Sequence, residues 1–270
     1  MSLIQALVLG IVQGATEFIP VSSSAHLVLV PWLLNWPAPS FAFDVLVQWG
    51  TLLAVVVYFW RDLIAIARAA IRDLLKGKPV ESAEAKLGWL IVLATIPAVA
   101  LGLAFKDFFE SAFGDTRGIA ALLIGTAVIL AAAERFGRRA RTMESIARPD
   151  ALIIGLWQAV SILPGISRSG ATIGGGMLRG LKREAAARFS FLMSIPVMLG
   201  AGLIALKDLK EAGDLAAQAP TIAVGFIAAA IVGFAVIHWL LQFLGKRSLY
   251  IFAVYCLIAG AGCLVVSFIR

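Results

Sequence analysis

Long apolar stretches alternate with short polar connections along most of the chain. An α-helix needs about 20 mostly apolar residues to cross a bilayer. Stretches of about this length lie roughly at 43–60, 88–105, 118–134, 187–206, 221–243 and 249–269. The hydrophobic pattern therefore predicts six transmembrane helices.

Two further apolar regions, 3–36 and 151–180, are interrupted by polar and helix-breaking residues. The interruptions are Gln13, Glu17, Pro20, Ser22, Ser23, Ser24 and His26 in the first region, and Pro164, Gly165, Ser167, Arg168 and Ser169 in the second. Irregular backbone at membrane depth is tolerated only where protein or a water-filled cavity satisfies its polar groups. We therefore expect two re-entrant helical hairpins rather than two additional spans.

Composition excludes a soluble enzyme. Of the 270 residues, 61% are hydrophobic and 14% are charged, against about 45–50% and about 25% in soluble domains. The mean hydropathy is +0.94. Disordered and collagen-like chains are excluded by the same numbers. The expected fold class is an all-α polytopic membrane protein, with residues 1–270 forming a single integral membrane domain.

The net charge of +7 is unevenly distributed. Most Lys and Arg residues lie in the segments 61–86, 135–148, 179–188 and 245–248. The positive-inside rule places these segments in the cytoplasm, and both termini on the outer side. The first hairpin then enters from the outer face and the second from the cytoplasmic face. The basic excess is explained as an orientation signal, so no nucleic-acid partner is expected.

The two halves of the chain resemble each other. ALVLGIVQ (6–13) aligns with ALIIGLWQ (151–158), and PVSSSAH (20–26) falls beside PGISRSG (164–170). Each half contains one hairpin and three spans, and an odd number of spans inverts the second copy. The expected division is repeat one at 1–134, a cytoplasmic linker at 135–149 and repeat two at 150–270. Chance similarity between apolar helices is the alternative, but the matching polar breaks favour an inverted repeat, whose binding site lies where the broken elements meet.

The second break has the features of an anion site. Pro164 and Gly165 end one half-helix, and the serines of PGISRSGAT (164–172) can cap the next, whose N-terminus attracts anions. Arg168 adds a permanent cation suited to phosphate. The expected substrate-binding residues at this break are Ser167, Ser169, Gly170 and Thr172. The alternative is a capped helix start in which Arg168 reaches the membrane surface or pairs with Glu17.

The first break supplies complementary groups. Gln13 and Glu17 are spaced i, i+4 and share a helix face, where their oxygens can hold a divalent cation. Ser23 and His26 lie within one turn of each other if the second half-helix starts at Ser23, which is a nucleophile and base arrangement. Each feature alone has a structural alternative, a cap or a buried histidine. Their occurrence opposite an Arg-bearing break favours catalysis.

Other polar residues in the apolar regions carry less information. His238 is isolated, and we interpret it as structural. Asp44 and Gln48 either line the same cavity or make packing contacts. Cys256 and Cys263 show no metal-binding spacing and are expected to be small core- or lipid-facing residues.

Two motifs of the sequence resemble those of a known family. QGATEFIPVSSSAH (13–26) and PGISRSGAT (164–172) are similar to the two signature motifs of the undecaprenyl pyrophosphate phosphatases, the bacitracin-resistance membrane phosphatases. FWRDL (59–63) and FSFLMSIP (189–196) extend the resemblance over essentially the whole chain. The first motif accepts Glu or Gln at its start, and this chain has Gln13, which argues against a mechanism that requires two carboxylates.

The resemblance implies hydrolysis of a polyprenyl diphosphate lipid to the monophosphate and inorganic phosphate, which recycles the carrier for cell-wall glycans. It also implies a divalent cation, magnesium or calcium, and a periplasm-facing site in the bacterial inner membrane. The matching positions are Glu17, Ser23, His26 and Arg168 as catalytic residues, with Gln13, Ser22, Ser167, Ser169 and Thr172 lining the site.

The mechanistic hypothesis combines both breaks. Arg168 and the helix N-terminus hold the diphosphate, Glu17 with Gln13 holds the metal, Ser23 attacks and His26 transfers the proton. Attack by His26 or by metal-bound water stays open, as does assembly into a homo-oligomer. The competing class is a lipid-phosphate transporter, because inverted repeats with broken helices are typical of secondary transporters.

Overall fold

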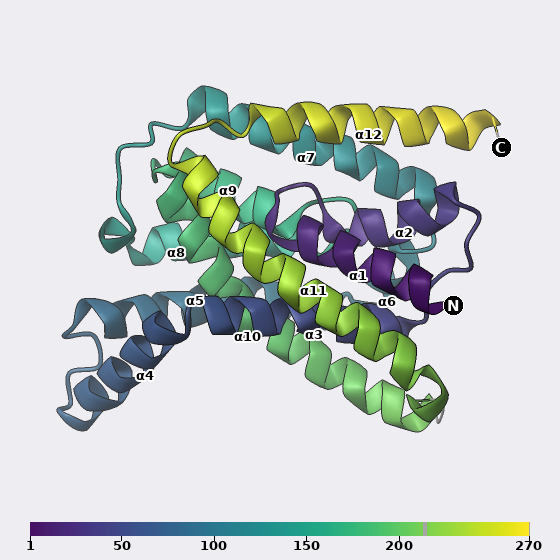
Figure 1. Ribbon diagram of the computed structural model, residues 1–270. Coiled ribbons are helices and arrows are strands. Elements are labelled where there is room, and N and C mark those ends of the chain that lie inside the picture. Colours follow the sequence, from purple (N-terminus) through teal and green to yellow (C-terminus); the bar gives the residue numbers. More distant parts are fainter. Residues whose placement is uncertain (213–214, 270) are drawn as a thin grey trace.

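The protein is a bundle of helices (Figure 1). The computed structural model describes residues 1–212 and 215–269, and within them the only extended pairing is an isolated bridge between Arg141 and Leu181. The helices are α1 (Leu3–Phe18), α2 (Ser23–Leu33), α3 (Phe41–Tyr58), α4 (Trp60–Leu75), α5 (Ala83–Ala104), α6 (Lys106–Ala112), α7 (Thr116–Phe136), the 3₁₀ turn η1 (Met143–Ser145), α8 (Arg148–Val160), α9 (Arg168–Leu178), α10 (Arg183–Ala212), α11 (Leu215–Leu244) and α12 (Tyr250–Ile269).

The predicted spans all coincide with long helices. Among the described residues, α5, α7, α10, α11 and α12 are long and apolar enough to cross a membrane. The sixth predicted span, 43–60, corresponds to α3, which is long and apolar enough only when it is counted together with α4. The two helices are bent by 73° at Phe59. The all-helical class and a multi-pass arrangement are therefore confirmed.

Helix α4 was not expected. The sequence analysis treated 61–86 as a basic loop, but its first part is an amphipathic helix that packs against α5. Leu63 and Ile66 lie on its packed side, while Arg68 and Arg72 face away from the core. The segment was interpreted from its charge alone. Its apolar residues recur with the periodicity of an amphipathic helix.

Both interrupted regions are helix, break, helix, as predicted. The first break separates α1 from α2, and the second separates α8 from α9. Ser22 caps α2 by accepting the Ala25 N–H at 3.3 Å, and Ser167 caps α9 by accepting the Gly170 N–H at 3.0 Å. A serine cap satisfies helix N–H groups that would otherwise be orphaned inside the protein.

The first helix of each half of the chain packs against a helix of the other half, an arrangement called exchanged packing below. Helix α1 packs on α11 from the other half, and α8 packs on α5 in the same way. Helices α3 and α10 contact each other, as do α7 and α12, which lie side by side in Figure 1. Each of the two interrupted elements, α1 with α2 and α8 with α9, is thus held by helices from both halves.

Equivalent glycines make this exchange possible. A Cβ atom at Gly10 of α1 would lie 2.4 Å from the carbonyl oxygen of Gly225, and one at Gly155 of α8 would lie 2.4 Å from that of Ala94. Gly10 and Gly155 occupy the same place in the two aligned segments. Helix backbones approach this closely only where a residue has no side chain.

Asp150, a buried carboxylate near the start of α8, holds the connection between α7 and α8 in place. Asp150 accepts from Arg141 at 2.6 Å and from Arg179 at 2.8 Å, which joins the 137–147 connection to α8 and α9. Burial raises the pKa of Asp150, but the hydrogen bonds from Arg141, the Ala147 N–H and Arg179 outweigh it and hold the pKa well below its usual range. Arg141 and Arg179, which the sequence analysis counted as orientation signals, therefore also share a structural partner. Cys256 and Cys263 are buried and free, as expected.

The glycine contact gives a test of the exchanged packing. Gly10→Ala should lower the melting temperature in detergent, because the added methyl group separates α1 from α11 at a cost of about 1–3 kcal/mol. Gly262→Ala is the matched control, since no heavy atom lies within 4 Å of the position that its Cβ would take. Because alanine has the higher helix propensity, that variant should be as stable as the parent or slightly more stable. Equal melting temperatures for the two variants would contradict the packing described above.

Candidate active site

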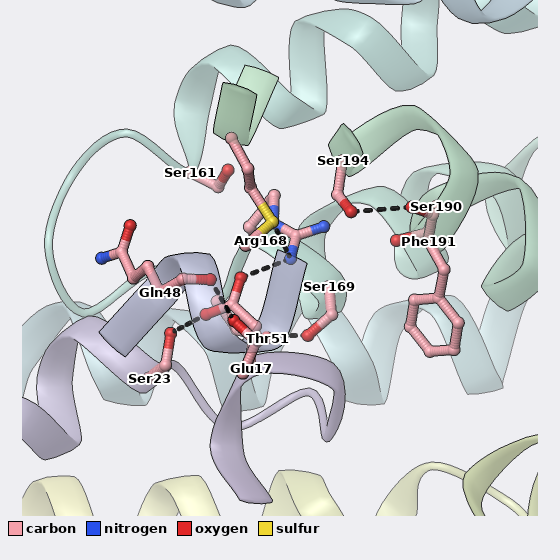
Figure 2. A network of polar contacts seen from close by, with 12 residues as sticks. Glu17, Ser23, Gln48, Thr51, Ser161, Arg168, Ser169, Ser190, Phe191 and Ser194 are labelled. Atoms are coloured by element: carbon pink, nitrogen blue, oxygen red, sulfur yellow. Dashed lines mark hydrogen bonds and ion pairs between the residues drawn. The ribbon is translucent and has the colours of Figure 1, made fainter. Parts of the chain in front are cut away.

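Glu17, near the end of α1, joins the two breaks. Its Oε1 atom pairs with Arg168 Nη2 at 2.5 Å, and its Oε2 atom accepts the Ser23 hydroxyl at 2.6 Å. Figure 2 shows Glu17 between these two side chains. The Glu17 side chain is 8% exposed and that of Arg168 is 14% exposed, so the ion pair is largely withdrawn from solvent. One carboxylate therefore connects a hydroxyl in the first hairpin to a cation in the second.

Arg168 begins α9 and retains an unused donor. Its Nη1 atom is buried without a hydrogen-bond partner among the described residues, while Nη2 also lies 3.9 Å from Met198 Sδ. An unpaired buried guanidinium N–H is costly unless a ligand or water accepts from it. The pairing with Glu17 is the alternative that the sequence left open for Arg168. The free Nη1 group is still suited to an anion oxygen.

Gln13 lies one turn before Glu17 and orients it. Its Nε2 atom donates to Glu17 Oε2 at 2.8 Å and to Thr51 Oγ1 at 3.4 Å. The bond to Thr51 ties the network to α3, and within that helix Thr51 donates to the Gln48 carbonyl at 2.7 Å. Gln13 Oε1 is buried without a partner in the described part of the chain.

Oxygen atoms of Gln13 and Glu17 provide part of the ligand set that a hard divalent cation requires. The unpartnered amide oxygen of Gln13 and the Glu17 carboxylate are oxygen ligands of the kind that magnesium and calcium prefer. Within residues 1–212 and 215–269, no group of three or more His, Cys, Asp or Glu could hold a metal. The protein thus offers a small ligand set, which suits a cation that also takes water and substrate phosphates.

The backbone of the first break is strained at Ser22. Its φ of 70° is left-handed, a conformation that non-glycine residues rarely adopt and that occurs preferentially at functional sites. The Ser22 carbonyl accepts from His26 Nδ1 at 2.8 Å. Because a carbonyl oxygen only accepts, His26 carries a proton on Nδ1, and in the neutral ring Nε2 is the acceptor. The strained residue thereby sets the orientation of His26.

His26 and Ser23 have different partners. His26 Nε2 lies 2.6 Å from the Tyr255 hydroxyl of α12, and the two rings stack with centroids 5.7 Å apart. The Ser23 hydroxyl donates to Glu17 instead. The start of α2 at Ser23 is as expected, but here the acceptor for the serine proton is the carboxylate and not the imidazole.

The second break is held by Thr126 of α7. The Thr126 hydroxyl donates to the Gly165 carbonyl at 3.0 Å and accepts the Ser167 N–H at 2.9 Å. Gly165 has a φ of 107°, and a Cβ atom there would lie 2.4 Å from the Ile119 carbonyl oxygen, so only glycine fits. The start of α9 is fixed in place by these contacts, which preorganises its first-turn N–H groups.

The other predicted residues of this break surround the helix start. The Ser169 hydroxyl donates to the Ile19 carbonyl of the first break at 3.3 Å, and Gly170 supplies the capped N–H. Thr172 bonds back to the Arg168 carbonyl at 2.8 Å and lies 2.6 Å from the Ser190 hydroxyl of α10. Ser169 therefore links the two breaks, while Thr172 connects α9 to α10.

Three contributors were missed by the sequence analysis: Thr51, Thr126 and Tyr255. Each lies in an uninterrupted apolar helix, where a single hydroxyl does not change the hydrophobic pattern. Thr51 had a weak signal, because it lies one turn beyond Gln48, which was considered as a cavity residue. No sequence signal pointed to Thr126 or Tyr255, since only the three-dimensional arrangement brings α7 and α12 to the breaks.

Comparisons with known proteins identify the family of the chain. Residues 6–262 match the family described as bacitracin resistance protein BacA. The chain is 46% identical to an undecaprenyl-diphosphatase of Thermomicrobium roseum over 100% of both chains. It is 46% identical to one of Chlorobium phaeovibrioides, covering 96% of this chain and 95% of the relative, and 42% identical to one of Nocardioides sp., covering 97% and 95%. The chain therefore belongs to the bacitracin resistance protein BacA family.

Proposed function

We propose that this protein hydrolyses undecaprenyl diphosphate to undecaprenyl phosphate and inorganic phosphate. This reaction recycles the lipid carrier of cell-wall glycans and accounts for bacitracin resistance as a family property. The observation that carries the proposal is the buried Glu17 carboxylate, which accepts the Ser23 hydroxyl and pairs with Arg168. A binding protein needs a cation for a diphosphate, but it has no need of a hydroxyl activated by a carboxylate.

Substrate binding uses the second break. Arg168 Nη1 is free to bond a phosphate oxygen, and the N-terminus of α9 adds N–H groups and the positive end of its dipole. Ser167, Ser169 and Gly170 shape this end of the helix, and Thr172 anchors it to α10. Phosphoryl transfer depends mainly on positioning and charge stabilisation, so this arrangement supplies much of the rate.

Ser23 is the proposed nucleophile. Its oxygen attacks the terminal phosphorus, its proton passes to Glu17, and the bond to the bridging oxygen breaks to release undecaprenyl phosphate. Water then cleaves the phosphoserine ester and releases inorganic phosphate. The 2.6 Å contact between the Ser23 hydroxyl and Glu17 supports this assignment.

His26 has a different role in this proposal. Its Nδ1 proton is bonded to the Ser22 carbonyl, and its Nε2 atom faces Tyr255, so it fixes the backbone that presents Ser23. Proton transfer by His26 requires rotation away from Tyr255. Attack by His26 or by water is the alternative that the variants below distinguish.

Gln13 and Glu17 would hold a divalent cation, magnesium or calcium. The buried, unpartnered Oε1 atom of Gln13 supports this assignment. When bound, such a cation neutralises phosphate oxygens and weakens the bond to the leaving group. The side chains themselves position the Ser23 hydroxyl and keep water away from the ion pair.

The proposed topology has six spans, with α3 as the span predicted at 43–60, and two re-entrant hairpins in an inverted repeat. The halves are 1–134 and 150–270, joined by a linker at 135–149. The exchanged packing of α1 and α8 supports this division. Both termini lie at one end of the bundle in Figure 1, opposite α4 and the turn between α11 and α12. The positive-inside rule puts the basic segments in the cytoplasm. The family resemblance, and not this rule, implies that the site faces the periplasm of the bacterial inner membrane.

Phosphate release in detergent micelles tests hydrolysis against transport. Purified protein with magnesium and undecaprenyl diphosphate should release phosphate, because hydrolysis needs no compartments. Glu17→Gln should reduce the rate by at least about a hundredfold, since the amide neither pairs with Arg168 nor takes a proton. Absence of phosphate release by the folded parent protein, together with lipid translocation in vesicles, would establish the transporter instead.

Substitutions at the first break test the nucleophile. Ser23→Ala should lower kcat by at least about a thousandfold, and His26→Ala by only about ten- to a hundredfold. Ser24→Ala is the matched control, because Ser24 bonds to Ser22 at 3.1 Å and makes no contact with Glu17 in the described network. If Ser23→Ala keeps most of its turnover while His26→Ala abolishes it, the serine assignment is wrong.

A further inference from the structure

The last helix of the chain, α12, reaches the first break through two consecutive residues. The Tyr255 hydroxyl lies 2.6 Å from His26 Nε2, and Cys256 Sγ lies 3.7 Å from the Pro20 carbonyl oxygen. Helix α12 otherwise packs mainly on α7, and neither α1 nor α2 is among its main packing partners. These two side chains therefore link α12 to the first break.

The hydrogen bonds of His26 define where its ring carries a proton. Nδ1 lies 2.8 Å from the Ser22 carbonyl oxygen, which can only accept, so Nδ1 is protonated. A charged ring would be costly at this half-buried position, because the Glu17 carboxylate already accepts from Ser23 and pairs with a cation. The ring is therefore neutral, Nε2 is the acceptor, and the Tyr255 hydroxyl is the donor.

The rings of His26 and Tyr255 also stack, which further restricts the imidazole. Their centroids are 5.7 Å apart and their planes differ by 11°. The imidazole is thus hydrogen-bonded at both nitrogens and covered on one face. Packing and hydrogen bonds together lock a side chain into one orientation, as is required of a group that supports a catalytic site.

This orientation bears on the proposed nucleophile through one strained residue. Ser22 has a φ of 70°, and its carbonyl oxygen accepts the Nδ1 proton of His26. A left-handed non-glycine residue persists only where its surroundings hold it. Ser23 follows directly, and its hydroxyl donates to Glu17 at 2.6 Å. The hydroxyl on α12 therefore influences where Ser23 is placed, although the two residues share no hydrogen bond in the described part of the chain.

The second break is held by a corresponding contact. Thr126 of α7 donates to the Gly165 carbonyl and accepts the Ser167 N–H. Helix α7 is the last helix of the first half of the chain and α12 is the last of the second half, and the two pack on each other. Each half thus supplies, from its last helix, one hydroxyl that holds the break of the other half.

We propose that Tyr255 is a positioning residue for the reaction proposed above. Its hydroxyl donates to Nε2 of His26 and holds the imidazole in the tautomer with the proton on Nδ1. That proton holds the Ser22 carbonyl, and thereby the Ser23 hydroxyl against Glu17. The effect of Tyr255 on turnover passes through His26. The kinetic part of this proposal rests on the proposed function, whereas the state of the imidazole ring is independent of it.

The state of the ring can be measured without any reaction. The chain contains two histidines, so the full-length protein in detergent, made with isotope-labelled histidine, gives nitrogen NMR signals from the rings of His26 and His238 alone. The variant His238→Gln identifies the His26 signals by elimination. We expect the parent to show a neutral His26 ring with its proton on Nδ1. Tyr255→Phe, which removes only the hydroxyl, should move the Nε2 signal and allow the second tautomer to appear.

Tyr250→Phe is the matched control for this measurement. Tyr250 lies on the same helix, is 44% exposed against 45% for Tyr255, and makes no hydrogen bond through its side chain in the described part of the protein. Its substitution should leave the His26 signals as they are in the parent. A His26 spectrum that Tyr255→Phe does not change, or a parent ring with its proton on Nε2, would overturn the proposal.

Turnover then tests whether the contact serves the reaction. Tyr255→Phe should lower kcat for phosphate release about tenfold and change KM less than about twofold, because it removes one hydrogen bond that positions a side chain and none that binds substrate. Tyr250→Phe should behave like the parent. In the His26→Ala background, Tyr255→Phe should have no further effect.

Two kinetic results would contradict the positioning role. An unchanged kcat in Tyr255→Phe would show that turnover does not depend on the hydroxyl. An equal loss with and without His26 would show that Tyr255 acts by another route. If the folded parent releases no phosphate, the proposed function fails, and the NMR signals of His26 still decide whether Tyr255 holds its ring.

Discussion

The contact between Glu17 and Arg168 is the interaction on which the centre of this protein depends. A buried ion pair is stable only when both partners are present and hydrogen-bonded, because either charge alone would be costly to bury. Glu17 meets this condition through Gln13, Ser23 and Arg168. Since the partners come from two hairpins that are distant in sequence, the ion pair forms only when both halves are assembled.

The packing of the helices follows from the same requirement. A break between two helices inside a protein leaves backbone groups that neighbouring segments must satisfy, and here groups of each break bond to the other half of the chain. Thr126 of α7 holds the second break, and the Ile19 carbonyl of the first break accepts from Ser169. Close helix contacts at Gly10 and Gly155 hold α1 and α8 where these bonds can form. Packing and site geometry are therefore two consequences of one arrangement.

Much of the architecture could be predicted from the sequence because membranes impose simple rules. Span length located the long helices, and polar residues inside apolar stretches located the breaks. The spacing of Gln13 and Glu17 was sufficient to place them together, since helix geometry fixes which residues share a face.

The remaining features depend on contacts between distant segments. The proton acceptor next to Ser23 is Glu17 rather than His26 because Tyr255 of α12 occupies the imidazole, and nothing in the local sequence indicates this contact. The amphipathic α4 was obscured for a different reason, because its charges were attributed to orientation alone. Local periodicity predicts elements, whereas the choice of partners among hydroxyl groups requires their positions in space.

The most direct test of the account is a double-mutant cycle on turnover, with Glu17→Gln, Arg168→Gln and the variant that carries both substitutions. If one ion pair organises both hairpins, the two changes share that loss, and the double variant should be clearly more active than the product of the two single losses predicts. Losses of activity that multiply would contradict it, because they would show that Glu17 and Arg168 act independently.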